Sequence, residues 1–229
     1  MRTLSIIMPV LDEAEVIADA LQALAAYRQR GAEVIVVDGG SHDATQDIAR
    51  PLADRVIAAP RGRAAQMNAG AAHARGGVLL FLHADTRLPP NADRLVLEGI
   101  ERSGRPWGRF DVAIAGRSPL LAMVAFTMNL RSRLTGIATG DQAMFATREA
   151  FAGGFPDIAL MEDIALSRRL KHISPPLCLW DKASTSGRRW EQRGVLRTIM
   201  LMWRLRLAYF LGAEPAALAR RYGYAPREP

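Results

Sequence analysis

A histidine and an aspartate stand directly after an unbroken run of apolar residues. Residues 78–82 are all apolar, and His83, Ala84 and Asp85 follow them. Such a run is typical of a central parallel strand, and open α/β sheets bind ligands at the carboxyl ends of these strands. A carboxylate placed there suits magnesium or manganese, which in turn can bind a substrate phosphate. The alternative is that Asp85 only caps the turn before Pro89.

A pair of adjacent carboxylates, Glu162 and Asp163, opens a predicted helix in the second half of the chain. Negative charges in the first turn of a helix are stabilising, so one interpretation is purely structural. The other interpretation is a general base, because neighbouring carboxyl groups can hold separated pKa values. The pattern of residues alone leaves both interpretations open.

Alternating strands and helices in the first half of the chain must position these groups. We predict strands at 4–10, 33–37, 55–57 and 78–82, with helices between them at 12–24, from 45 onward and at 61–70. This alternation indicates an α/β fold in which a mostly parallel sheet has helices on both faces. A glycine-rich dinucleotide motif or P-loop does not follow the first strand, which disfavours those two classes of protein.

The end of the second strand and the start of a later helix both suit an anionic ligand. Asp38 and Gly39 end that strand, and a helix that begins near Thr45 offers free backbone N–H groups. Arg61 and Arg63 lie in the first turn of the next helix, where positive charge opposes the helix dipole. An anionic partner for Arg61 or Arg63 is therefore expected.

The second half of the chain predicts a different mixture of elements. We expect a helix at 91–101, an alternating strand at 107–114, an apolar helix at 118–133 that serves as core, and a short strand at 177–180. The segment 194–211 predicts a final basic, amphipathic helix with a tryptophan. That helix suits an anionic membrane surface, but packing on the domain or on a twin subunit explains the same pattern. The tail 213–229 is polar, with one short helix at most.

Composition limits the classes of protein and of partner. The 229 residues carry a formal charge of +7, and only two of the 30 basic residues are lysines. Arginine suits phosphate recognition, although a genome with arginine-rich codons would produce the same excess. The charges are interleaved and a nucleic-acid motif is absent, so we expect no nucleic-acid partner. A single cysteine, Cys178, excludes an internal disulfide. We expect a cytoplasmic protein, because the sequence shows no signal-peptide pattern and no membrane-length apolar run.

Four segments in order resemble the family 2 glycosyltransferases, which have the GT-A fold. Residues 9–13 (PVLDE), 38–45 (DGGSHDAT) and 82–85 (LHAD) resemble the family motifs Pro-Val-x-Asn-Glu, Asp-Asp-Gly-Ser-x-Asp-x-Thr and Asp-x-Asp. Residues 63–70 resemble the family's helix that leads to the Asp-x-Asp strand, and residues 140–146 its strand before the acceptor site. The whole chain is similar to a compact bacterial subgroup that is associated with arsenosugar assembly.

The resemblance implies a nucleotide site, a metal site and a catalytic base. Asp85 matches the metal-binding carboxylate, and Mn²⁺ or Mg²⁺ is the implied cofactor. Asp163, with Glu162 beside it, matches the Glu-Asp motif of inverting enzymes, in which the aspartate deprotonates an acceptor hydroxyl. His83 replaces the first Asp of Asp-x-Asp, and Asp12 replaces the usual Asn. The residues expected to bind the nucleotide are Pro9, Val10, Leu11, Glu13, Asp38, Gly39, Arg63, His83 and Ala84.

A segment of small polar and basic residues at 184–190 loosely resembles an Arg-Trp-bearing segment of some family members. One interpretation is a solvated charged turn. The other is a mobile loop in which Arg188 and Arg189 clamp the diphosphate and Trp190 covers a sugar or base. We expect the second role for these three residues.

Together these expectations describe an inverting, metal-dependent glycosyltransferase that moves a sugar from a nucleotide diphosphate sugar to an unknown hydroxyl acceptor. Residues 1–190 form its GT-A catalytic domain, with a nucleotide-binding half (1–86) and an acceptor half (87–190). Residues 191–229 form a helix and tail that pack on the domain, on a second subunit or on the inner face of a membrane. The alternatives are a nucleotidyltransferase, which would normally have a glycine-rich basic loop after its first strand, and a sugar-nucleotide binding protein without catalysis.

Overall fold

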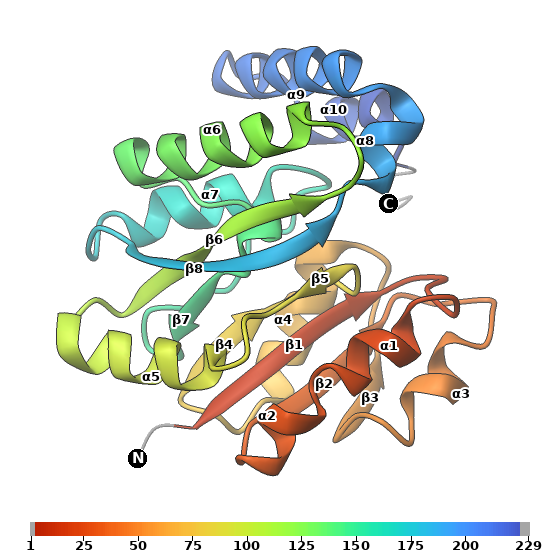
Figure 1. Cartoon of the computed structure of the whole chain (residues 1–229), viewed down its shortest axis with the longest axis vertical. Helices are drawn as coiled ribbons and strands as arrows, with labels where there is room; N and C mark the ends of the chain where they lie inside the picture. Colours follow the sequence, from red (N-terminus) through yellow and green to blue (C-terminus); the bar gives the residue numbers. More distant parts are fainter. Residues whose placement is uncertain (1–2, 225–229) are drawn as a thin grey trace.

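A mixed eight-stranded sheet organises the chain in the computed structural model, which describes residues 3–224 (Figure 1). The strand order is β3-β2-β1-β4-β7-β6-β8-β5. The pairs among the first four strands of this order are parallel, β7 is antiparallel to both β4 and β6, β8 is parallel to β6, and β5 is antiparallel to β8. The strands are β1 (Leu4–Val10), β2 (Glu33–Asp38), β3 (Arg55–Ala58), β4 (Val78–Phe81), β5 (Thr86–Arg87), β6 (Trp107–Ala115), β7 (Phe145–Thr147) and β8 (Leu177–Ser186).

The helices confirm the predicted alternation, with three local differences. The helix expected at 12–24 begins only at Ile17 and ends at Gln22 as α1, with a further short helix, α2, after it. The strand expected at 140–146 begins only at Phe145, after a 3₁₀ turn. The prediction of a loop at 184–190 is wrong, because β8 continues to Ser186 and α8 follows. The helices are α1 (Ile17–Gln22), α2 (Ala25–Gln29), α3 (Thr45–Ala49), α4 (Arg63–His73), α5 (Ala92–Ser103), α6 (Leu120–Thr135), η1 (Gly140–Gln142), α7 (Glu162–Leu170), α8 (Arg188–Arg193), α9 (Val195–Phe210) and α10 (Pro215–Tyr222).

Both faces of β1 are buried, as its apolar run predicts. Ile6 and Met8 belong to a layer that packs against α1, α2 and α5, whereas Ile7 belongs to a layer that packs against α4 and α7. The side chains of a strand alternate between its two faces, so this arrangement requires apolar residues at successive positions. The central sheet is therefore covered on both sides, and its polar groups gather at the strand ends.

Close packing of α4 on the sheet fixes the position of the helix start. A Cβ atom on Gly70 would lie 2.4 Å from Ile7 Cγ2 and 2.9 Å from Val37 Cγ2, so a larger residue would push the helix away. Because α4 follows β3, its first residue, Arg63, stands at the carboxyl edge of the parallel strands. This edge is where an α/β sheet binds its ligands.

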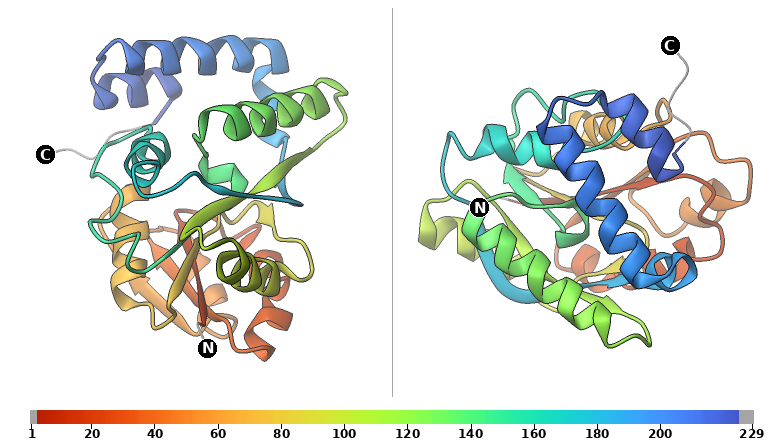
Figure 2. Two further views of the ribbon diagram at one scale, coloured as in Figure 1. Left: turned by 90° about the vertical axis from the view of Figure 1, so that its left-hand side faces the viewer. Right: turned by 90° about the horizontal axis from the view of Figure 1, so that it is seen from above.

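The C-terminal helices lie together at the end of the molecule farther from β3 (Figures 1 and 2). α6 packs on β6 through Val112, Leu121 and Val124, and α10 packs under α9 through Leu218 and Leu205. The short helix expected in the tail is α10; residues 225–229 of that tail lie outside the described residues. Among residues 3–224, we find no helix that is both long and apolar enough to cross a membrane.

Candidate active site

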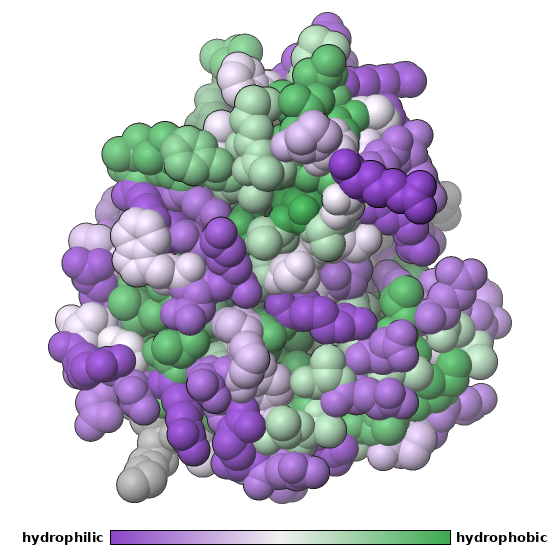
Figure 3. Space-filling model, viewed as in Figure 1, coloured by the Kyte–Doolittle hydropathy of each residue, from purple (hydrophilic) through white to green (hydrophobic). Residues whose placement is uncertain are grey.

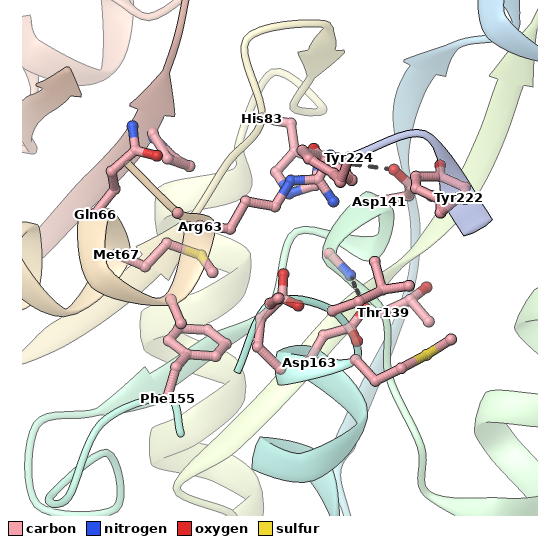
Figure 4. A pocket seen from close by; sticks show the side chains of 18 of the residues that line it. Arg63, Gln66, Met67, His83, Thr139, Asp141, Phe155, Asp163, Tyr222 and Tyr224 are labelled. Carbon is pink, nitrogen blue, oxygen red and sulfur yellow. Dashed lines mark hydrogen bonds and ion pairs between the residues drawn. The ribbon is translucent and has the colours of Figure 1, made fainter. Parts of the chain in front are cut away.

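One cleft of about 660 Å³ lies at the carboxyl edge of the parallel strands (Figure 4). Its volume is in the range of small-molecule sites. The ends of β1 and β4 and the start of α4 form one wall, the 139–144 and 155–164 segments form the next, and the C-terminal helices complete the cleft. Most of the site residues expected from the sequence line it: Pro9, Val10, Leu11, Glu13, Arg63, His83, Ala84, Asp85, Glu162, Asp163, Arg189 and Trp190.

Three of the expected site residues, Asp38, Gly39 and Arg188, are not part of the cleft lining. Arg188 is exposed on α8, where its Nη1 atom lies 3.9 Å from Glu15 Oε2. Gly39 lies under the side chain of Gln66, and a Cβ atom there would be 3.0 Å from the Gln66 Cδ. Gly39 and Asp38 therefore lie behind the cleft lining, whereas Arg188 lies on the exposed surface of α8.

Asp38 is fully buried and organises the turn after β2. Its Oδ2 atom accepts hydrogen bonds from Gly40 N (2.9 Å), Ser41 N (3.0 Å) and Gln46 Nε2 (2.8 Å), and Ser41 Oγ donates to Oδ1. Burial alone would raise the pKa of Asp38, but the hydrogen bonds from Ser41, Gly40 and Gln46 lower it overall. Asp38 therefore contributes to a nucleotide site by holding the turn in its conformation.

The turn after β2 is tied directly to the loop after β1. Asp12 Oδ1 accepts a hydrogen bond from His42 N (2.8 Å), and Glu13 N donates to Thr45 Oγ1 (2.8 Å). Gln66 Nε2 donates to Val10 O and Val37 O, at 2.8 Å each, which joins α4 to both strand ends. The segment 38–45 thus braces the segment 9–13, which lines the cleft, with the aspartate at position 12 acting as a loop acceptor.

His83 lies inside this wall as a neutral imidazole. Burial and then the positive charge of Arg63 lower its pKa to about 4. Its Nδ1 atom is 3.7 Å from Asp141 Oδ1, and because the ring is neutral this contact is not an ion pair. A Cβ atom on Gly140 would come within 2.7 Å of the ring, so glycine is needed for the imidazole to occupy this place.

Asp85 is exposed to the cleft and keeps most of its carboxylate free. Its Oδ1 atom accepts a long hydrogen bond from Thr86 Oγ1 (3.3 Å). Among residues 3–224, no group of three histidine, cysteine, aspartate or glutamate side chains could hold a metal without other ligands. Magnesium commonly binds one or two carboxylates together with substrate phosphates and water, so Asp85 fits a metal that arrives with a diphosphate.

Two arginines and two tyrosines crowd the cleft beside His83 (Figure 4). The Arg63 guanidinium lies over the Tyr224 ring, 5.2 Å from its centroid. Arg189 Nη1 donates a hydrogen bond to Tyr222 Oη at 2.9 Å. The rings of Tyr222 and Tyr224 are stacked, with centroids 5.7 Å apart. These contacts join the C-terminal helices to the nucleotide-side wall and leave guanidinium groups available for an anion.

The sequence analysis did not identify Tyr222, Tyr224 and Arg206 as lining residues. They belong to the segment 191–229, which was expected to pack on the domain, a second subunit or a membrane; α9 and α10 also contribute to the cleft lining. A sequence feature that could have indicated this is the pair of tyrosines two positions apart in an otherwise polar tail. The expected division of the chain at residue 190 remains a prediction.

Glu162 and Asp163 lie at the first turn of α7, after Met161 in a left-handed conformation with φ of 72°. Asp163 Oδ2 accepts a hydrogen bond from Gly140 N at 3.0 Å, which fixes this carboxylate against the next wall of the cleft. Glu162 is 6% exposed. Burial and then the negative charge of Asp163 raise the pKa of Glu162 to about 7. Two adjacent carboxyl groups with different surroundings are a common basis for acid–base chemistry.

Comparison with known proteins supports the same fold and family. Glycosyltransferase AglE of Haloferax volcanii is 36% identical over 90 residues, which cover 35% of this chain and 30% of that protein. The mannosyltransferase PcManGT from Pyrobaculum calidifontis, in complex with GDP-Man and Mn²⁺, has a TM-score of 0.66 at 23% identity over 98% of this chain and 66% of that chain. S. aureus TarS 1–349 in complex with UDP-GlcNAc has a TM-score of 0.64 at 17% identity, over 80% of this chain and 58% of that chain.

This chain therefore spans less than two thirds of the length of AglE and of TarS 1–349. The structural likenesses confirm the expected GT-A fold, with its mixed sheet and flanking helices. The family model for glycosyl transferase family 2 matches residues 5–152, which include the β1, β2 and β4 ends and the start of α4. Because this match covers more than half of the chain, the protein belongs to glycosyl transferase family 2.

Proposed function

We propose that this protein transfers a sugar, with inversion, from a nucleotide diphosphate sugar to an acceptor hydroxyl. The observation that carries the proposal is a single cleft in which Asp85 and Asp163 stand on different walls, with Arg63 between the strand ends and the C-terminal helices. Such a cleft can hold a diphosphate at one carboxylate and an acceptor at the other. Its structural neighbours include proteins with bound UDP-GlcNAc and with bound GDP-Man and Mn²⁺.

The donor end of the site is proposed to lie between residues 9–13 and Arg189. The loop after β1, braced by the turn after β2, provides the wall for the base and ribose, and Ala84 leaves room beside His83. Asp85 would hold Mn²⁺ or Mg²⁺, and the bound metal would neutralise negative charge on the diphosphate. The guanidinium groups of Arg63 and Arg189 add fixed positive charge beside the leaving group.

Asp163 is proposed as the base, with Glu162 in support. Gly140 N holds Asp163 in place, so its carboxylate is oriented toward one position in the cleft. A proton held on Glu162 below about pH 7 avoids a second negative charge at the same point. The acceptor hydroxyl gives its proton to Asp163 as its oxygen attacks the anomeric carbon, and the diphosphate leaves from the opposite face.

Release of nucleoside diphosphate tests this function. UDP-sugars and GDP-sugars are incubated with the protein, with and without Mn²⁺, and free nucleoside diphosphate is measured. We expect metal-dependent release from at least one donor in the wild type and in Asp47→Ala, a variant of an exposed carboxylate on α3. Asp85→Ala should lose both the release and the metal-dependent thermal stabilisation by nucleoside diphosphate.

Other outcomes would identify the alternative functions. Donor binding without any release would indicate a non-catalytic sugar-nucleotide binding protein. Release of pyrophosphate from a nucleoside triphosphate with a sugar phosphate would indicate a nucleotidyltransferase. The narrower similarity to the arsenosugar subgroup stays a prediction, which an identified acceptor would test.

A further inference from the structure

Two arginines near Asp163 carry buried nitrogen atoms that have no hydrogen-bond partner in the described part of the chain. They are Nε and Nη2 of Arg131, on α6, and Nε of Arg206, on α9. By contrast, the fully buried Arg109 is paired with Asp111. A buried donor without a partner costs free energy, so a group that accepts hydrogen bonds from these nitrogen atoms would be stabilised there.

Arg206 lies on the side of the cleft that carries Asp163, and Arg131 is close to it but outside the cleft lining. Arg206 lines the cleft together with Asp163 and Asp141, whose negative charges act on it. Arg131 is affected by both Arg206 and Asp163: burial and then the nearby Arg206 lower its pKa to about 10. Two cations that repel each other in a buried place are stabilised by an anion between them.

The donor diphosphate already has a different set of cations. Arg63 and Arg189 are the positive charges that act on His83, which is two residues from Asp85. Arg206 is not among the principal charges acting on His83, and it lies on the helix face formed by Thr198, Met202 and Arg206. The cleft lining therefore includes Arg63 and Arg189 near His83 and Arg206 near Asp163, and Arg63 also acts on Glu162.

We propose that Arg206, assisted by Arg131, binds an anionic group of the acceptor, a phosphate or a carboxylate, and so directs the acceptor hydroxyl to Asp163. The planar guanidinium group can bind either anion with two parallel hydrogen bonds. This inference rests on the proposed function, because it gives the chemical class of the acceptor.

Titration with inorganic phosphate tests the anion site. The wild-type protein is first saturated with magnesium and the nucleoside diphosphate that binds it, so that the donor end is filled, and phosphate binding is then followed by calorimetry. Arg206→Met should weaken phosphate binding about tenfold or more, as expected for loss of charged hydrogen bonds. The matched control is Arg94→Met, which removes an exposed arginine of α5.

Several results would overturn the inference. Phosphate affinity in Arg206→Met equal to that in Arg94→Met would exclude Arg206 from an anion site. An equal loss of nucleoside diphosphate affinity would assign Arg206 to the donor instead. Arg131→Met provides a second variant, which should also weaken phosphate binding. Failure of the proposed function looks different, because it appears in the release assay as absence of metal-dependent nucleoside diphosphate release, whereas the dependence of phosphate binding on Arg206 is measured separately.

Two further arms distinguish the sources of the anion. Glycerol 3-phosphate represents a water-soluble phosphate monoester, and vesicles that contain phosphatidic acid represent a phosphate at a lipid surface. Arg206-dependent binding of either supports the anion site and identifies its source. If Arg206→Met binds phosphate, glycerol 3-phosphate and the vesicles as tightly as the wild type does, the anion site is contradicted.

An independent observation concerns the outer surface of the same helices. α6 exposes apolar side chains at 123, 126, 130 and 134, and α9 exposes them at 196, 200, 203, 207 and 210, each series at helical spacing. We call these nine residues the apolar face. Phe126 is 65% exposed and Trp203 71% exposed. Figure 3 shows apolar residues gathered in the upper part of the molecule, where α6 and α9 lie.

The two segments that carry the apolar face contain charged residues of one sign. The sequence has no aspartate or glutamate between Asp111 and Asp141, nor between Glu191 and Glu214. Arg117, Arg197 and Arg204 are exposed within these two segments. An exposed apolar face whose own two segments carry arginines and no carboxylates complements an anionic lipid surface.

We infer that the apolar face binds the surface of an anionic bilayer, with the side chains of Phe126 and Trp203 inserted among the lipids. α9 would then lie along the membrane with its opposite face in the cleft. For residues 194–211, the sequence alone leaves both a membrane and a second subunit as binding partners. The apolar face and its arginines favour the membrane.

Cosedimentation with vesicles tests this inference. The protein should bind phosphatidylglycerol vesicles and not phosphatidylcholine vesicles, and binding should weaken as salt rises. The double variant Phe126→Ser, Trp203→Ser should reduce partitioning about tenfold or more. Ile173→Ser, an exposed apolar residue outside the face, is the matched control. Equal partitioning of the two variants, or a stable dimer that the double variant dissolves, would overturn the inference.

Discussion

Replacement of Glu162 by glutamine should make the stability of the folded chain less dependent on pH. Glu162 is 6% exposed, and burial and then the charge of Asp163 raise its pKa from the ordinary 4.5 to about 7, against an opposing effect of Arg63. The folded chain binds this proton more tightly than the unfolded chain does. Stability from this group is therefore complete below about pH 4.5 and is lost as pH rises through 7. The shift corresponds to about 3 kcal/mol.

Urea unfolding at several pH values between 4.5 and 8.5 measures the effect. The wild type should lose stability relative to Glu162→Gln as pH rises, so that the difference changes by up to about 3 kcal/mol across the range. Contributions from other titrating groups are shared by the two proteins and largely cancel. Glu101→Gln, at an exposed position on α5, should follow the wild type. A difference between Glu162→Gln and wild type that stays constant with pH would refute the reasoning.

Three more substitutions test other parts of the site. Asp163→Asn should reduce sugar transfer at least ~100-fold with donor affinity unchanged, and near-normal transfer would assign the base elsewhere. Gly140→Ala should lower stability by about 1–3 kcal/mol in thermal or urea unfolding, because its Cβ would displace His83. Asp38→Ala should lower the free energy of unfolding, measured in urea, by about 1.5–3 kcal/mol at pH 7. The wild-type advantage over Asp38→Ala should shrink as pH falls through 3.8, because the folded pKa of Asp38 is lowered.

The first half of the fold was predictable because each of its strands is short, apolar and followed by a polar turn. β1, β2, β3 and β4 all begin and end within two residues of the expected limits. Burial on both faces leaves little freedom in the sequences of β1, β2 and β4, whereas β3 is a partly exposed edge strand. The loop expected at 184–190 was wrong for a physical reason. Ser184, Thr185 and Ser186 have polar side chains typical of loops, but β8 pairs with both β5 and β6 there, and tertiary pairing outweighs local preference.

The candidate site was predictable where a residue ends an element and was not where it depends on distant packing. Asp85 and Asp163 follow or begin recognisable elements, so their place at the cleft edge could be expected. Asp38 ends a strand equally clearly, but only the structure shows that its carboxylate is used by Gly40, Ser41 and Gln46. Tyr224 and Arg206 reach the cleft through the fold of the C-terminal helices, which residue patterns near the sequence end do not specify.

Strained backbone conformations lie around the same cleft, and this observation does not depend on similarity to a protein family. In the described part of the chain, the non-glycine residues with positive φ are Asp12, Ala143 and Met161, at 53°, 44° and 72°. Each lies within a segment that lines the cleft: the loop after β1, the turn around Asp141, and the start of α7. Such conformations cost of order 1–3 kcal/mol each and tend to persist where a functional geometry requires them. At Met161, the left-handed turn starts α7 directly at Glu162 and Asp163, so the strain lies beside the carboxylates that the proposed chemistry needs.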